Sequence, residues 1–199
     1  MMTIMRNVKH NARAAAKEAS HERILSVAAR AIRRSGYDGT GVADIMKEAG
    51  LTHGAFYAHF ESREAMLAEA ATRACAEAAS ATAAAIDRVP AEQALATVLR
   101  GYLSPQHMAH IESGCPLAAL GSETARQAPE VRHATTRHIK AMVDLIARQL
   151  PDWGQPAAHE RALLTVSAMV GTLVLARAVD EPALSSSLCE AALKYLAPH

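Results

Sequence analysis

Apolar residues recur at helical spacing along most of the chain. The first set on one helical face is Ile24, Val27, Ala28, Ala31 and Ile32. These positions follow the order i, i+3, i+4, i+7 and i+8, which is typical of an amphipathic α-helix. Ser35 and Gly36 come next, and glycine at this place is a common helix stop. The pattern therefore predicts a first helix that ends near Ser35.

Two shorter helices are predicted directly after the first. The second has its apolar residues at Val42, Ile45, Met46 and Ala49. Thr40 precedes it as a candidate N-cap, and Gly50 ends it. Thr52 is the candidate cap of a third helix, which carries Phe56, Tyr57 and Phe60. Because only Gly50-Leu51 joins these two helices, the segment is a candidate helix-turn-helix.

Six further helices are predicted between Ser62 and the end of the chain. Ser62 caps a fourth that runs to Ile86, and a fifth ends at Ser104-Pro105, before a loop. Pro116 and Pro129 stand where a sixth and a seventh would begin. The eighth covers about residues 157–178, and the ninth carries Leu184, Leu188 and Tyr195. We therefore predict an all-α fold with about nine helices.

The eighth predicted helix is apolar on nearly all sides, which requires burial in the centre of the protein or against another subunit. We expect a four-helix dimer interface built from the last two helices. Its expected residues are Leu164, Val166, Met169, Val170, Gly171, Leu173, Val174 and Leu188.

Composition and charge narrow the class of protein. The chain has 199 residues with a formal net charge of +1, yet residues 1–34 hold eight Lys and Arg against two acidic residues. This bias favours contact with a polyanion, although a solvated helix face would also produce it. Three widely spaced cysteines indicate free thiols in the cytoplasm. The uncharged stretch 162–176 is short for a membrane span, so we expect no membrane anchor.

The stretch from Arg23 to Leu67 reads RILSVAARAIRRSGYDGTGVADIMKEAGLTHGAFYAHFESREAML. It resembles the N-terminal DNA-binding domain of the TetR family of bacterial transcriptional regulators. The resemblance implies a DNA-binding domain over 18–78, with its helix-turn-helix at 41–60, and a ligand-binding and dimerisation domain over 79–199. Gly41 and His53 depart from the hydroxyl and basic residues that many members of the family carry.

DNA contact is expected mainly on the third predicted helix. Hydroxyl, imidazole and small side chains there can reach phosphates or base edges, and a basic residue at the start of the fourth helix can clamp a phosphate. The family resemblance assigns DNA contact to Thr52, His53, Gly54, Ala55, Tyr57 and His59, and we expect Thr40 and Arg63 to take part as well. For Tyr57 and His59, packing between helices is the alternative interpretation.

The C-terminal part contains candidate ligand and thiol chemistry. We expect a small-molecule cavity lined by Tyr102, Met108, Cys115, His138 and Met142, unless the tyrosine and the second methionine only fill the core. Cys115 precedes a predicted helix start, where the helix dipole favours a thiolate, and some TetR relatives sense electrophiles through such a cysteine. A buried inert thiol is the alternative interpretation.

These features together predict a cytoplasmic, homodimeric, ligand-responsive regulator, most simply a repressor of a pseudo-palindromic DNA operator. No catalytic motif is visible in the sequence, and we expect neither a cofactor nor a metal. The rival hypothesis is a small helical enzyme that uses Cys115 together with His107 and His110, which could share a zinc ion at i, i+3 spacing.

Overall fold

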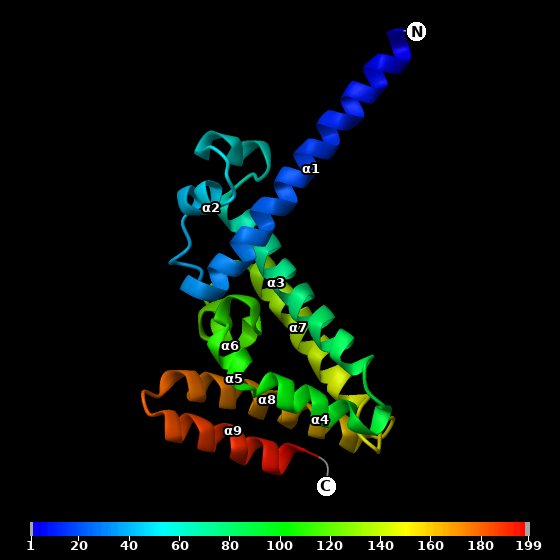
Figure 1. Ribbon diagram of the computed structural model, residues 1–199, viewed down its shortest axis with the longest axis vertical. Coiled ribbons are helices and arrows are strands. Elements are labelled where there is room, and N and C mark those ends of the chain that lie inside the picture. The colour runs from blue at the N-terminus through cyan, green and yellow to red at the C-terminus, as the bar shows by residue number, and fades with distance from the viewer. Residues whose placement is uncertain (1, 198–199) are drawn as a thin grey trace.

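A computed structural model describes the backbone of residues 2–197 and the side chains of residues 12–197. The described chain is entirely helical (Figure 1). Its α-helices are α1 Met2–Ser35, α2 Val42–Glu48, α3 Arg63–Ile86, α4 Ala91–Tyr102, α5 Pro105–Ala109, α6 Pro116–Thr124, α7 Pro129–Ala147, α8 Pro156–Ala178 and α9 Pro182–Leu196. Two 3₁₀ helices, η1 His53–Ala58 and η2 Ile111–Ser113, complete it. The predicted all-α class is confirmed.

Local sequence signals set many of the helix boundaries. Gly36 follows α1 with a φ of 76°, a left-handed conformation that glycine adopts without a steric penalty. The predicted cap at Ser62 is confirmed, because its hydroxyl accepts a hydrogen bond from the Ala65 amide at 3.0 Å. Helices α5 to α9 each have proline in the first turn, where the missing N–H costs no helical hydrogen bond.

Two elements differ from the sequence prediction. The segment after Ser104, predicted as a loop, forms α5, because the Ser104 hydroxyl accepts a hydrogen bond from the His107 amide and Pro105 opens the turn. The third predicted helix is the 3₁₀ helix η1, and Thr52 makes no side-chain cap there. The described chain thus has nine α-helices, as predicted, but α5 takes the place of η1 in that count.

The N-terminal helices do not form a core of their own. Residues of α1, α2, η1 and the first half of α3 pack with Leu120 of α6 and with Val131 and Ala134 of α7. Helix α3 also runs without interruption through residue 78, where the predicted DNA-binding domain ends. The two predicted domains therefore share both a helix and part of a hydrophobic core.

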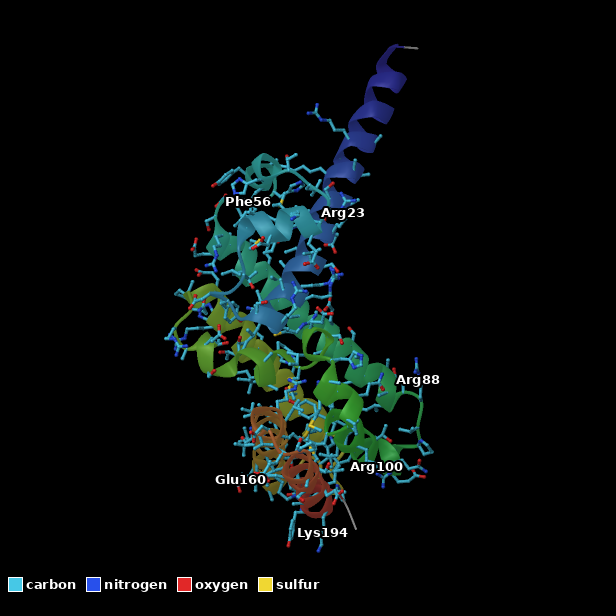
Figure 2. All side chains as sticks on the ribbon, turned by 60° about the vertical axis from the view of Figure 1, so that its left-hand side comes forward. Arg23, Phe56, Arg88, Arg100, Glu160 and Lys194 are labelled. Atoms are coloured by element: carbon cyan, nitrogen blue, oxygen red, sulfur yellow. The ribbon has the colours of Figure 1, made fainter. Side chains whose placement is uncertain are left out.

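The helix-turn-helix and the last two helices lie at opposite ends of the molecule. Figure 1 shows α2 and η1 beside the middle and lower part of α1, whose first turns project above them, while α8 and α9 form the lower layer. In Figure 2, Phe56 and Arg23 mark the upper end, and Glu160 and Lys194 mark the lower end. Helix α3 connects the two regions alongside α7.

Helix α8 is the one described helix that is long and apolar enough to cross a bilayer by length and composition alone. The core helices of water-soluble proteins pass the same test, so the property is weak evidence for a membrane span. In this structure α8 packs against α6, α7 and α9, with Ala162, Met169 and Leu173 buried.

Candidate DNA interface and ligand cavity

The 3₁₀ helix η1 presents polar side chains outward from a buried aromatic base. Phe56 and Phe60 are buried, and their rings stack with centroids 5.4 Å apart. Thr52, His53 and Gly54 are exposed, and Tyr57 is 70% exposed. Because the apolar side of this short element is held by the core, its opposite side is free to meet a partner. These exposed residues form the candidate DNA interface.

Three other residues expected at the DNA interface are less accessible. Ala55 is half-buried against the N-terminal core. His59 is half-buried too, and its ring lies 5.9 Å from that of His21 in α1. Burial lowers the pKa of His59, and the neighbouring His21 and Lys17 lower it further. Arg63 donates hydrogen bonds to the carbonyls of residues 37 and 40, and so ties the start of α3 to the loop before α2.

Thr40 does not belong to this interface, which corrects our sequence-based expectation. The residue is 3% exposed, and its hydroxyl donates a hydrogen bond to the Gly36 carbonyl at 2.7 Å. It does not cap α2 either, because the N-cap of that helix is Gly41, which has no side chain to do so. The hydroxyl instead closes the turn that follows α1.

Part of the N-terminal positive charge is neutralised within the protein. Arg33 is buried and pairs with Glu77 at 2.7 Å. Arg34 lies 3.2 Å from both Glu48 and Glu112, so the last turn of α1 contacts α2 and η2 together. The basic residues near the end of α1 therefore support the fold. Arg13 and Lys17, nearer its start, are exposed.

A cavity of about 560 Å³ lies within the C-terminal helices. The second half of α3, over residues 78–85, forms one wall, and α4 and α7 form much of the rest. Four of the expected ligand-site residues line it: Tyr102, Cys115, His138 and Met142. The sequence placed the ligand site among the fourth to eighth predicted helices, which include α3, but it named no residue of the α3 wall. The run of alanines there, whose side chains fill little space, was the available signal.

Met108 is not among the residues that line the cavity, which corrects its expected role. Its sulphur lies 3.6 Å from the Ser185 hydroxyl and 3.9 Å from the Cys189 sulphur, in a cluster with α8 and α9. All three cysteines are buried and free, as expected. Burial raises the pKa of Cys75 to about 12 and also raises that of Cys189.

His107 joins two helices and has no free ring nitrogen. The Cys115 amide donates to its Nε2 at 2.9 Å, so Nε2 must accept. Nδ1, 2.6 Å from the Tyr102 carbonyl, is then the protonated nitrogen and donates. Because both nitrogens are committed, His107 cannot ligate a metal while this arrangement holds. The His107 and His110 pair of the rival enzyme hypothesis is therefore not a preformed zinc site, and that hypothesis loses this part of its chemistry.

Burial favours the neutral form of three cavity side chains, those of Tyr102, His107 and His138. It lowers the pKa of both His107 and His138, and it raises the pKa of Tyr102, with Cys115 as a smaller cause. The Tyr102 hydroxyl and the His138 Nε2 are buried with no hydrogen-bond partner among the described residues. These are the polar atoms of the cavity wall that the protein itself does not satisfy.

The expected dimer residues divide between two sides of α8. Val166, Met169 and Leu173 are buried in the core of the single chain. They therefore do not belong to the dimer interface, which corrects our expectation. Leu164 and Val174 are exposed, at 69% and 41%, while Val170 and Gly171 are half-buried. Leu175 of α8 and three residues of α9 add exposed apolar surface: Leu184, Ala191 and Tyr195. Leu188 is half-buried on the same side of α9.

The chain resembles known regulators in both of its parts. Residues 24–70 match the family described as bacterial regulatory proteins, tetR family, and residues 89–184 match the C-terminal domain of LmrA/YxaF-like transcriptional regulators. The HTH-type transcriptional regulator LmrA of Bacillus subtilis is 30% identical over 157 residues, which cover 76% of this chain and 82% of LmrA. An uncharacterized HTH-type regulator of Mycobacterium tuberculosis is 29% identical over 165 residues, covering 78% and 83%.

Solved structures share the fold. Reduced NemR of E. coli superposes with a TM-score of 0.77 at 18% identity, covering 89% of this chain and 95% of NemR. A TetR transcriptional regulator from Chloroflexus aurantiacus gives 0.76 at 24% identity, covering 92% and 94%. The relatives in sequence and the neighbours in structure agree with the outward-facing helix-turn-helix described above. The chain therefore belongs to the TetR family of bacterial transcriptional regulators and carries that family's DNA-binding helix-turn-helix.

Proposed function

We propose that this regulator is a cytoplasmic, homodimeric repressor, not an enzyme, and that a small molecule releases it from its operator. One observation carries the proposal: a single helix, α3, belongs to both functional regions. Its first half packs in the core that holds η1, and its second half forms a wall of the cavity. A ligand that displaces this wall would move the DNA-binding elements with it.

In this mechanism each subunit offers η1 to one half-site of a pseudo-palindrome. The hydroxyls of Thr52 and Tyr57 would donate to phosphate oxygens, and His53 would reach a base edge or a phosphate. Arg13 and Lys17, exposed on α1, would add phosphate contacts beside them. Arg63 would act mainly through its hydrogen bonds to the loop before α2, which transmit movement of α3 to the helix-turn-helix.

A second contact supports coupling between the two ends. Glu123 of α6 accepts a hydrogen bond from the Tyr37 amide at 2.9 Å, just after α1. The segment before α6 contains Cys115 in the cavity wall and Glu112 paired with Arg34. A ligand that shifts this segment would therefore change its contacts with α1 as well.

The dimer would form through the outward sides of α8 and α9. Leu164, Leu175, Leu184 and Tyr195 are large apolar side chains exposed on these two helices. A contiguous exposed apolar surface of this kind marks an interaction site, and half-buried Gly171 would allow close approach of a second α8. A two-fold axis here would leave both copies of η1 free at the opposite end.

The test is binding of the purified protein to the DNA that flanks its own coding region, with and without a panel of metabolites and electrophiles. We expect sequence-specific retention without added metal, and release by at least one compound. Affinity should fall as salt rises, by about 0.9 in the log–log slope for each phosphate that is neutralised. A DNA affinity that does not change with salt concentration, or turnover of a substrate without DNA binding, would refute the proposal.

An electrophile would need to reach Cys115, which is buried in the cavity wall. If its thiol is the sensor, electrophiles should release DNA from the parent protein, whereas Cys115→Ser should stay bound. If Cys115→Ser responds like the parent, the thiol switch is wrong, and a reversibly bound molecule is the inducer.

A further inference from the structure

The cavity wall contains two polar groups whose hydrogen bonding is incomplete. The Tyr102 hydroxyl and the His138 Nε2 lack a partner among the described residues, and His138 is only 5% exposed. A buried polar group without a hydrogen bond destabilises the folded protein, so native proteins satisfy nearly all such groups. Both side chains line the same cavity. A molecule bound there is the simplest partner for both groups.

The wall also selects against ligand charge. Among the described residues, those that line the cavity include no Asp, Glu, Lys or Arg. Burial lowers the pKa of His138 and raises that of Tyr102, so both are uncharged near neutral pH. A charged ligand would lose its hydration and meet no charged side chain among the residues that line the cavity. Alanine, leucine, isoleucine and methionine side chains supply most of the remaining surface.

The two unpaired groups, Tyr102 and His138, can both act as hydrogen-bond donors into the cavity. A protonated Tyr102 phenol can donate, and a neutral His138 ring donates from Nε2 in one of its tautomers. His107, the other imidazole in the wall, is excluded, because both of its nitrogens already bond to backbone groups. The matching ligand group is an acceptor oxygen. A carbonyl suits both donors, since its oxygen has two lone pairs.

We propose that the cavity reversibly binds an uncharged, largely apolar molecule through a ketone, ester or amide oxygen that accepts hydrogen bonds from Tyr102 and His138. This inference deepens the proposed ligand-responsive function and rests on it. It names the class of inducer and the two residues that recognise it, and it needs no covalent bond to Cys115.

A matched set of biphenyl probes tests the class of ligand by equilibrium dialysis against the full-length protein. The probes are 4-acetylbiphenyl, 4-ethylbiphenyl, biphenyl-4-carboxylate and 4-phenylbenzylammonium, which share one apolar body. We expect the ketone to bind about tenfold more tightly than the hydrocarbon, the scale of one or two hydrogen bonds, and both ions to bind at least tenfold more weakly than the ketone. An ion that binds as tightly as the ketone, or no binding by any probe, would overturn the proposal.

Two variants test the residues. Tyr102→Phe removes one oxygen, so it should weaken ketone binding by about fivefold to tenfold and leave hydrocarbon binding within twofold of the parent. The unchanged hydrocarbon affinity shows that the variant is folded and its cavity intact. His138→Leu should also lose ketone affinity, whereas His159→Gln, an exposed histidine outside the cavity, should not. If Tyr102→Phe binds the ketone like the parent, the assignment is wrong.

DNA retention measured with the same probes separates this inference from the proposed function. Selective ketone binding that leaves DNA retention unchanged would support the ligand class and refute ligand-driven release. Release of DNA by the carboxylate or the ammonium probe, without release by the ketone, would support ligand-driven release and refute the uncharged class.

Discussion

At the residue scale, the structure separates side chains that hold the helix-turn-helix together from those that can touch DNA. Consecutive residues of η1 have opposite roles, because buried Phe56 anchors the element and exposed Tyr57 points away from the core. Thr40 and Arg63 were both expected to contact DNA, but each donates its hydrogen bonds to backbone carbonyls close by. Burial therefore decides which polar side chains are free to contact DNA and which stabilise the helix-turn-helix.

Tyr57 provides the sharpest residue-scale prediction. Tyr57→Phe should weaken binding to all DNA sequences by about 1 kcal/mol, the scale of one hydrogen bond to a phosphate. His53→Ala should also relax base preference if its ring reaches a base edge. Both are measured by titrating operator and unrelated DNA. If both variants bind like the parent, η1 is not the recognition element.

The buried histidines predict how stability depends on pH. Burial lowers the pKa of His138 below the ordinary value of about 6.5 that it has in the unfolded chain. Between these two pKa values the unfolded chain binds more protons, so the free energy of unfolding falls as pH drops below about 6.5. His59 and His107, whose pKa values are also lowered, act in the same direction.

Replacing His138 should remove one of these contributions. Between about pH 7.5 and pH 5.5, the free energy of unfolding should decrease less for His138→Leu than for the parent protein. Urea unfolding followed by circular dichroism at both pH values measures this difference. The exposed His159→Gln should lose as much as the parent. An equal loss in all three proteins would show that His138 does not titrate between the folded and unfolded states.

At the element scale, the short segment between α4 and α6 holds several helices together. Helix α5 and η2 connect α4 to α6, and His107 joins the end of α4 to the start of α6 through two hydrogen bonds. Arg177 of α8 adds a third attachment, since its guanidinium donates to the His107 carbonyl at 2.6 Å. These contacts fix the part of the cavity wall that contains Cys115.

Two glycines near this junction make a matched pair. A Cβ on Gly114 would lie 2.7 Å from the His107 Nε2, whereas one on Gly121, within α6, would meet no atom within 4 Å. Gly114→Ala should therefore destabilise the protein by about 1–3 kcal/mol through overpacking. Gly121→Ala should stabilise it by up to about 1 kcal/mol, because alanine favours helix. Urea unfolding of both variants checks the signs, and a neutral Gly114→Ala would mean that the junction is loose.

At the scale of the whole molecule, function depends on the separation of its ends. The helix-turn-helix lies toward one end, and α8 and α9 lie at the other (Figure 1). The cavity is lined by the second half of α3 together with α4 and α7. Helices α3 and α7 pack along each other between these regions. In a dimer joined at the lower end, a ligand in the cavity that moves α3 would change the spacing between the two helix-turn-helix segments.

Charge placed on the outer face of α8 should break the dimer. Leu164→Glu should give monomers with weakened operator binding, because an exposed leucine at an apolar interface would be replaced by a charge that must lose its hydration. Ile139→Glu, at an exposed position of α7, is the control and should remain dimeric. Light scattering coupled to size exclusion measures the mass. A parent protein that is monomeric at micromolar concentration would contradict the prediction.

The sequence by itself determined the all-α class, most helix boundaries and part of the exposed face of the helix-turn-helix, namely Thr52, His53, Gly54 and Tyr57. Those features depend on local chemistry: apolar spacing, proline in a first turn, Gly36 after α1 and the cap at Ser62. The motif between Arg23 and Leu67 added the family. Four of the five expected cavity residues were also found, because small and flexible side chains along the later helices indicated space to fill.

Only the tertiary structure decided which side of each element is buried. The apolar pattern of α8 cannot distinguish its core side from its outer side, so Met169 and Leu173 were assigned to the wrong surface. Met108 and Thr40 were misplaced for a related reason, since their neighbours come from distant segments or from a turn that the residue itself closes. Periodicity indicates that one face of a helix is apolar. Which element or subunit covers that face depends on contacts between residues far apart in the chain.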